Sequence, residues 1–192
     1  VKETPQNEDT PFHPRSPYGI SKVAGFDLTR NFRESYGIHA SSGILFNHES
    51  ERRGYEFVTR KISRAASLIK LKKQKFLELG NLEAKRDWGY APEYIQAMWL
   101  MLQQKKPDDY VVGTGETYSI KYFAENAFDI LNLKLDKYLK INKKFIRPAE
   151  VDLLVADPKK IKNKIGWKAK VKINDLIEKM VINDLNLVEK KI

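Results

Sequence analysis

The sequence predicts an α/β fold, in which helices alternate with short strands. Three observations support this class. Pro17 and Gly37 are the residue types that begin and end a helix, and they bracket the first helical stretch. A strand-like stretch, IHASSGILFN, follows at residues 38–47, and Pro92 opens a further helix. Alternation of this kind is typical of sheets covered by helices.

The expected elements can be given in order. Residues 1–17, rich in proline and polar side chains, are expected to form a loop. The first half of the chain then continues with a helix at 18–35, the strand at 38–47, a charged loop at 51–54, a helix at about 56–69 and a short strand at 75–81. The second half is expected to hold helices at 92–101 and 120–131, a strand entering a loop at 109–115, an irregular tail to Pro148, and short helices at 158–165 and 174–188.

Composition excludes several classes of protein. With 42% hydrophobic and 11% aromatic residues in 22.3 kDa, the chain is expected to bury the core of one domain, or of one domain and a piece of another. It has no run of 18 apolar residues and no basic-then-apolar leader, so we expect no membrane segment or signal peptide and a cytoplasmic location. The absence of cysteine excludes disulfides, and His13, His39 and His48 show no metal-ligand spacing.

The net charge of +10 has two possible explanations, an anionic partner or a surface of solvated lysines. The lysines are scattered and mark no recognition helix, so the solvated surface is the favoured interpretation and no nucleic-acid partner is expected. Sugar nucleotides and NADP are also anions that such a field would attract.

Tyr18 and Lys22 stand four residues apart in the stretch SPYGISK. Residues at this spacing share one face of a helix, and a lysine there would hold the phenol in a positive field that suits acid–base work. With nine tyrosines in a lysine-rich chain, about one such pair is expected by chance. A half-buried tyrosine beside a solvated lysine is the simpler alternative for the pair taken alone.

No glycine-rich dinucleotide loop follows any expected strand. The nearest match, Gly113-Thr-Gly115, lacks its third glycine and is interpreted as a turn. If the fold binds a nucleotide, its opening βαβ unit is therefore expected to lie outside this chain.

Five stretches, taken in order, resemble the GDP-mannose 4,6-dehydratase family of extended short-chain dehydrogenases/reductases. They are SPYGISK, GILFNHESERRGYEFVTRKI, LGNLEAKRDWGYAPEYIQAMWLML, TGETYSIKYFAENAF and RPAEVDLLVADPKK with IGWKAK. The resemblance covers only the later part of the family's chain. It implies the remainder of an NADP-binding Rossmann-like domain at residues 1–54, with the helix that carries Tyr18 and Lys22, and at 55–192 a mainly GDP-binding region interleaved with the last Rossmann strands. The N-terminal βαβ half would be absent.

The resemblance also implies a reaction. Tyr18 would act as the base on the sugar 4-hydroxyl, and Lys22 would bind the nicotinamide ribose and support Tyr18. GDP-mannose would lose water to give GDP-4-keto-6-deoxymannose on the route to GDP-fucose, with a tightly held NADP regenerated in each cycle.

Further roles follow from the resemblance. His48 and Arg53 would contact NADP, and Asn47 the nucleotide sugar. The residues that would face the GDP moiety are Thr59, Lys61, Gly80, Asn81, Arg86, Arg147 and Glu150. The residue types fit, because arginines suit a pyrophosphate and a carboxylate accepts from a guanine edge. An alternative role for Arg86 and Arg147 is to form salt bridges at the protein surface. Trp88, Trp99 and Trp167 are expected to pack.

Some features depart from the family pattern. Gly19 and Ser21 stand where small apolar residues are common, and Glu51 stands where the family usually has proline. The threonine-or-serine and glutamate partners in elimination would precede this segment, so we expect a partial chain, inactive alone, that needs its N-terminal half and forms a homo-oligomer when complete. The alternatives are a related nucleotide-sugar epimerase or reductase, and a non-catalytic binding or assembly fragment.

Overall fold

Two units of the chain each build their own core. The computed structural model describes residues 3–145 and 153–190. Unit 1 comprises residues 1–48, 87–117 and 153–170, and unit 2 comprises residues 49–86, 118–152 and 171–192. The chain thus passes between the units several times. The assignment of cofactor binding to residues 1–54 and of substrate binding to residues 55–192 stays a prediction.

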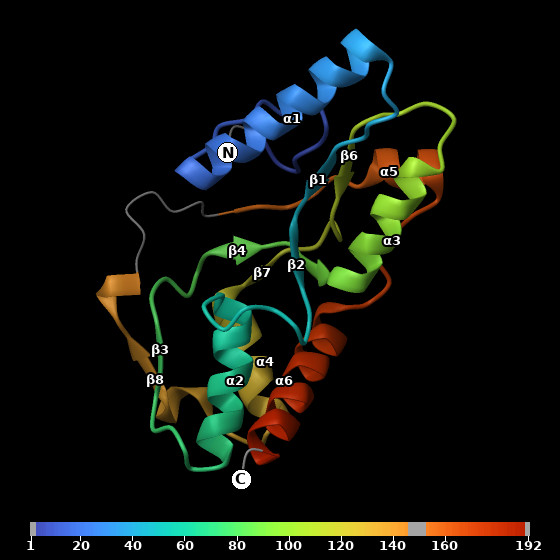
Figure 1. Ribbon diagram of the computed structural model, residues 1–192. Coiled ribbons are helices and arrows are strands. Elements are labelled where there is room, and N and C mark those ends of the chain that lie inside the picture. Colours follow the sequence, from blue (N-terminus) through green and yellow to red (C-terminus); the bar gives the residue numbers. More distant parts are fainter. Residues whose placement is uncertain (1–2, 146–152, 191–192) are drawn as a thin grey trace. The chain divides into compact units, whose positions relative to one another are not determined.

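Unit 1 begins with a long helix whose ends are set by local chemistry. α1 (Pro17–Tyr36) starts after Ser16, whose hydroxyl accepts a hydrogen bond from the Gly19 N–H, and Pro17 occupies the first turn. Gly37 ends α1 in the left-handed conformation, at φ +65°, where glycine avoids the strain of a side chain. The helix expected at residues 18–35 is therefore confirmed (Figure 1).

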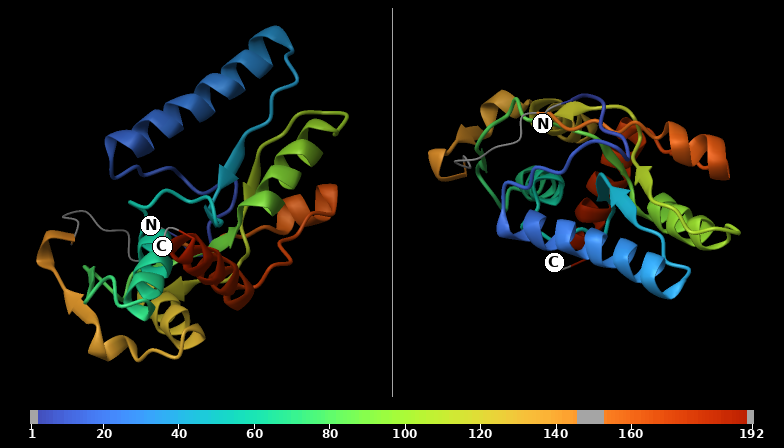
Figure 2. Two further views of the ribbon diagram at one scale, coloured as in Figure 1. Left: turned by 60° about the horizontal axis from the view of Figure 1, so that its bottom comes forward. Right: turned by 90° about the horizontal axis from the view of Figure 1, so that it is seen from above.

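A pair of parallel strands forms the centre of unit 1. β1 (Gly43–Leu45) pairs in parallel with β6 (Tyr110–Val112), and β2 (Asn47–Glu49) pairs with β5 (Trp88–Tyr90). α3 (Ala91–Leu102) and α5 (Lys159–Ile165) complete the unit, with α5 against β6 (Figure 2). Its core consists of Tyr94, Ala97, Met101, Tyr110, Val112, Ile161 and Trp167. The single strand expected at 38–47 is instead two three-residue strands.

Unit 2 is organised around three packed helices. α2 (Val58–Lys70), α4 (Ile120–Ile130) and α6 (Ile173–Glu189) contact one another pairwise (Figure 1). Phe123 and Phe128 of α4 and Met180 of α6 are fully buried, and each such side chain contributes about 1.5–3 kcal/mol. Burial of these faces explains why the three expected helices form with bounds within a few residues of the predictions.

Short strands and turns complete unit 2. β3 (Leu77–Leu79) pairs in parallel with β8 (Leu139–Ile141), and β4 (Lys85–Arg86) pairs antiparallel with β7 (Tyr118–Ser119). Two 3-10 turns, η1 (Leu135–Lys137) and η2 (Lys143–Phe145), flank β8. None of β4, β7 and β8 was expected, because strands of two or three residues carry too short a pattern to detect.

The tryptophans do not all pack. Trp88 and Trp167 are buried, as expected, but Trp99 is 60% exposed. The expectation for Trp99 is wrong because α3 buries Tyr94, Ala97 and Met101, and Trp99 lies on the opposite side of that helix. Within residues 3–145 and 153–190, no helix has the length and apolar character needed to cross a membrane.

Candidate functional site

Tyr18 and Lys22 share one face of α1. The Lys22 Nζ lies 5.2 Å from the centroid of the Tyr18 ring, so the ammonium stands over the face of the phenol ring. Both side chains are exposed, and Tyr18 is 72% exposed. The one-turn spacing expected from the sequence is therefore present as a direct contact. An exposed phenol with a cation beside it is a geometry from which a proton can be exchanged with a bound hydroxyl group.

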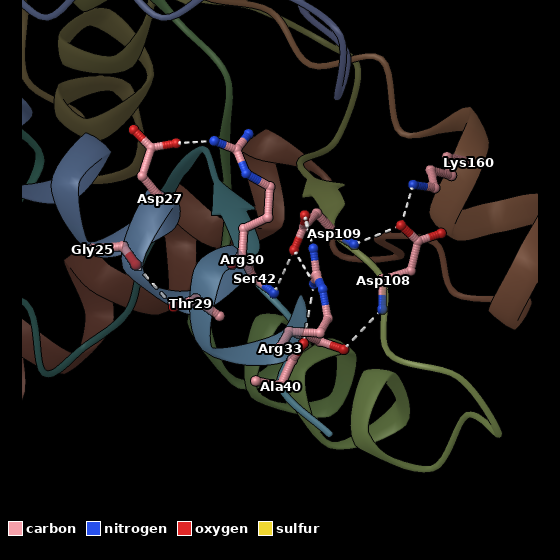
Figure 3. Close-up of polar contacts among 11 residues, drawn as sticks. Gly25, Asp27, Thr29, Arg30, Arg33, Ala40, Ser42, Asp108, Asp109 and Lys160 are labelled. Atoms are coloured by element: carbon pink, nitrogen blue, oxygen red, sulfur yellow. Dashed lines mark hydrogen bonds and ion pairs between the residues drawn. The ribbon is translucent and has the colours of Figure 1, made fainter. Parts of the chain in front are cut away.

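The far end of α1 is fixed to the rest of unit 1 by Arg33. Its guanidinium forms two parallel hydrogen bonds of 2.8 Å to the carboxylate of Asp109, and Nη1 also donates to the Ala40 carbonyl at 3.0 Å (Figure 3). Asp109 accepts in addition from the Ser42 N–H at 3.0 Å. Two-pronged pairs of this kind set orientation as well as adding energy. Arg33 thereby ties the helix that carries Tyr18 to the start of both β1 and β6.

Asn47 and His48 follow β1, on the short strand β2. Both side chains are half-buried. The His48 Nδ1 lies 2.8 Å from the Phe46 carbonyl oxygen, and since a carbonyl only accepts, Nδ1 carries the proton of this hydrogen bond. The imidazole stacks on Tyr94, with 5.2 Å between ring centroids. In the neutral ring, Nε2 is then the acceptor, ready for a hydroxyl or amide donor.

Arg53 and Thr59, in unit 2, both contact one buried carboxylate. The Arg53 Nε lies 3.1 Å from Oε2 of Glu49, and the Thr59 hydroxyl donates to the same oxygen at 2.7 Å. Thr59 is 1% exposed and its hydroxyl is engaged with Glu49. A direct contact of Thr59 with substrate stays a prediction.

Lys61 lies further along α2. Its Nζ is 3.5 Å from the centroid of the Phe145 ring. Burial lowers the pKa of Lys61, and the charge of Glu78 opposes that shift. A partly desolvated ammonium over an aromatic face binds anions more strongly than one in water, which agrees with the expected nucleotide contact but does not test it.

The remaining candidates of unit 2 lie near β3 and β4. Gly80 and Asn81 directly follow β3, and the Asn81 side chain accepts from the Glu83 N–H at 2.9 Å. Arg86 lies in β4, and its Nη1 donates to the Lys85 carbonyl at 2.8 Å. Arg147 and Glu150 fall at 146–152, outside the described residues.

The candidates are divided between the two units. Unit 1 holds Tyr18, Lys22, Asn47 and His48, and unit 2 holds Arg53, Thr59, Lys61, Gly80, Asn81 and Arg86. The structure brings Tyr18 together with Lys22, and Arg53 together with Thr59 through Glu49. The roles of all these residues stay predictions.

Two buried acids were missed by reasoning from the sequence. Glu49 is 2% exposed, and burial raises its pKa against the opposing effects of Thr59 and Arg53. Asp87 is fully buried and accepts from the N–H and hydroxyl of Thr114 and from the N–H groups of Gly115 and Ala156. Burial raises the pKa of Asp87 as well, although these four hydrogen bonds oppose the shift. Their places inside the NHES and RDWG stretches were the available signal.

Within the part of the chain that the structure describes, no three histidine or acidic side chains are grouped to hold a metal ion.

Comparison with solved structures identifies the class of fold. A Pseudomonas aeruginosa protein named RMD, solved with NADPH, matches with a TM-score of 0.88 at 22% identity, over 96% of this chain and 61% of that one. A dTDP-glucose 4,6-dehydratase from Bacillus anthracis, solved with NAD, gives a TM-score of 0.85 at 17% identity, over 98% of this chain and 58% of that one. The α/β fold is that of the extended short-chain dehydrogenases/reductases, as expected.

Comparison with known sequences identifies the family. A family model described as GDP-mannose 4,6 dehydratase matches residues 1–180. GDP-mannose 4,6 dehydratase 1 of Arabidopsis thaliana is 52% identical over 187 residues, which cover 97% of this chain and 52% of the relative. The Homo sapiens GDP-mannose 4,6 dehydratase is 44% identical over 205 residues, covering 98% and 55%. The chain belongs to the GDP-mannose 4,6 dehydratase family, and it spans about half the length of the curated relatives it matches.

Proposed function

We propose that this chain supplies the acid–base pair and much of the nucleotide-sugar site of a GDP-mannose 4,6-dehydratase, a hydro-lyase that converts GDP-mannose to GDP-4-keto-6-deoxymannose and water. The observation that carries the proposal is the contact of Lys22 with Tyr18 in a chain of this family. Tyr18 takes the proton of the sugar 4-hydroxyl, and the adjacent ammonium of Lys22 stabilises the phenolate that forms. A cytoplasmic location belongs to the same proposal.

The cofactor of this proposal is NADP, which supplies hydride acceptance and return when bound. Its ring end would meet Lys22, His48 would contact it through the acceptor Nε2, and Arg53 would meet a phosphate. The donor set fits an anionic dinucleotide: Lys22 is exposed, and the terminal nitrogens of Arg53 have no partner among the described residues. Support for a nicotinamide dinucleotide comes from the similar structures solved with NADPH and NAD. The choice of NADP rests on the arginine, whose planar fork matches a phosphate monoester.

The substrate side of the proposal uses GDP-mannose. Asn47 would contact the sugar, and the GDP moiety would be held by Thr59, Lys61, Gly80, Asn81, Arg86, Arg147 and Glu150. Arg86 and Lys61 are cationic side chains suited to a pyrophosphate. Turnover would also require the N-terminal half that the relatives carry, and the assembled enzyme would be a homo-oligomer.

A reconstitution assay tests this proposal. The purified chain is titrated with GDP-mannose by calorimetry, then mixed with the N-terminal half of the Arabidopsis thaliana relative and assayed for the keto sugar. We expect turnover only in the mixture. Tyr18→Phe should reduce it at least a hundredfold. Tyr36→Phe, at the exposed far end of the same helix, is the matched control and should leave it unchanged.

The alternatives predict different outcomes. Binding of GDP-mannose without turnover in a folded, assembled mixture would favour a binding or assembly role. Turnover of another nucleotide sugar, with GDP-mannose unchanged, would favour an epimerase or reductase. Equal turnover by Tyr18→Phe would overturn the assignment of the base.

A further inference from the structure

Glu49 is a buried acid two residues before the arginine loop, which we define as residues 51–54. Its side chain is 2% exposed. Its Oε2 accepts a hydrogen bond from the Thr59 hydroxyl at 2.7 Å and forms an ion pair with Arg53, whose Nε lies 3.1 Å away. A carboxylate buried to this degree is retained only when it is paired, because desolvation of an isolated charge is costly. The Oε2 of Glu49 is thus fixed by Thr59, and the same oxygen pairs with Arg53.

The guanidinium of Arg53 is constrained on two sides. Glu49 forms an ion pair with its Nε, and the central carbon lies 3.6 Å from the centroid of the Phe57 ring, so the aromatic ring packs against the guanidinium plane. The two terminal nitrogens have no partner among the described residues, and the Arg53 side chain is 24% exposed. The outer edge of the fork therefore remains available to an anion, in a fixed orientation.

The backbone of the arginine loop has a separate anchor. Nη1 of Arg60 donates to the carbonyls of Glu51 and Arg53, and Arg60 in turn pairs with Asp184 at 2.7 Å. Both Arg60 and Asp184 are buried. Since Arg60 fixes the main chain of the loop, the contact with Glu49 acts on the Arg53 side chain itself.

We propose that Glu49 is a positioning residue, which orients the Arg53 guanidinium so that its outer edge binds a phosphate monoester on the ribose of the dinucleotide. This inference rests on the proposed function, in which Arg53 contacts NADP. Glu49 would not touch the ligand and would act through Arg53. Residues that orient the ligands of a metal ion in the same indirect way typically change metal affinity by about 10- to 100-fold, and we expect an effect of similar size here. The chemical class recognised is a ribose 2′-phosphate.

The test uses the chain itself and two isomeric probes, adenosine 2′-monophosphate and adenosine 5′-monophosphate. NMR of the arginine Nε–Hε groups follows Arg53 directly during each titration. We expect the 2′-isomer to shift the Arg53 signal, and Glu49→Gln to weaken its binding about tenfold while binding of the 5′-isomer changes little. Thr59→Val, which removes the other anchor of Glu49, should act in the same direction and provides a second route if Glu49→Gln does not fold.

Ser63→Ala is the matched control. Ser63 is buried on α2 and donates to Asp184, so its loss weakens the helix packing without touching Arg53 or Glu49. Its ratio of affinities for the two isomers should equal that of the unaltered chain. A drop in the ratio in Ser63→Ala as large as in Glu49→Gln would show that general loosening accounts for the effect, and would overturn the proposal.

Two other results would also overturn it, and they separate it from the proposed function. If the unaltered chain binds the 2′-isomer at Arg53 and Glu49→Gln binds it equally well, Glu49 does not position Arg53, while the cofactor contact of Arg53 stands. If the 2′-isomer leaves the Arg53 signal unmoved, both the positioning role and the phosphate contact fail. The dehydratase proposal is then still judged by the reconstitution assay, which does not depend on Arg53.

Discussion

Arg33 and Asp109 join α1 to the start of β6 through two hydrogen bonds of 2.8 Å, across 76 residues of sequence. Both side chains are largely buried, at 16% and 13% exposed. Because none of the residues of α1 is buried, this pair is a main attachment of the helix that carries Tyr18 and Lys22. Its loss should therefore affect both the stability of unit 1 and the placement of the candidate base.

The first prediction concerns Asp109→Asn, which leaves the shape intact but removes the charge. We expect the free energy of unfolding to fall by about 2 kcal/mol, the range for hydrogen bonds to charged groups. Urea denaturation followed by circular dichroism measures this. Asp27→Asn is the matched control, because Asp27 forms a half-exposed pair with Arg30 and should cost about 0.5 kcal/mol or less. Equal losses in the two variants would contradict the prediction.

The same pair predicts a pH dependence. Burial alone would raise the pKa of Asp109, but the hydrogen bonds from Arg33 and Ser42 and the charge of Arg33 together lower that pKa. A folded-state pKa below the unfolded value means that the stabilisation is complete above the unfolded pKa, about 3.9, and is lost as the pH falls through the folded pKa. Stability measured from pH 6 down to pH 2 should show this loss, and Asp109→Asn should lack it.

The contribution of Asp87 to stability should change with pH in the opposite direction. Burial raises its pKa, so the folded state binds the proton more readily than the unfolded state. The contribution of Asp87 to stability should therefore decline as the pH rises from the unfolded pKa through the folded pKa, and should stay constant above it. The difference between unaltered chain and Asp87→Asn, measured by urea denaturation at each pH, isolates this effect. A difference that does not vary with pH would argue against it.

Arg60 and Asp184 test the core of unit 2. The pair is almost completely buried between α2 and α6, at 4% and 0% exposed. Arg60→Met alone should cost about 3–5 kcal/mol because it strands a buried carboxylate, and the double variant Arg60→Met/Asp184→Leu should recover roughly half of that loss. Recovery stays partial because the carbonyls of Glu51 and Arg53 lose their donor. A double variant that is less stable than Arg60→Met would contradict this account.

Substitution of two glycines by alanine should change the stability of the protein in opposite directions. A Cβ on Gly113 would lie 2.3 Å from the Cβ of Ala156, so Gly113→Ala should destabilise unit 1 by about 1–3 kcal/mol. A Cβ on Gly25, inside α1, would meet nothing within 4 Å, so Gly25→Ala should stabilise by about 0.5–1 kcal/mol. Thermal unfolding of the two variants gives the comparison. Shifts of the two melting temperatures in the same direction would contradict the close contact between Gly113 and Ala156.

The sequence by itself determined the helices and the family. α1 was predictable because its signals are local: Pro17 stands in its first turn, and Gly37 ends it with an N–H that donates to the carbonyl of Arg33, four residues back. The five family stretches were recognisable in the same way, as residues in order along the chain. Tyr18 and Lys22 belong here too, because helical spacing alone brings them together.

Only the tertiary structure decided the short strands and the roles of the buried acids. β2 and β5 are three residues each, and they form because each supplies the hydrogen-bonding partner of the other. Asp87 accepts from Thr114, 27 residues away, and from Ala156, 69 residues away, while Thr59 turns inward to Glu49. These contacts join residues 10 to 69 positions apart, and a buried polar group needs a partner only once packing has removed it from water.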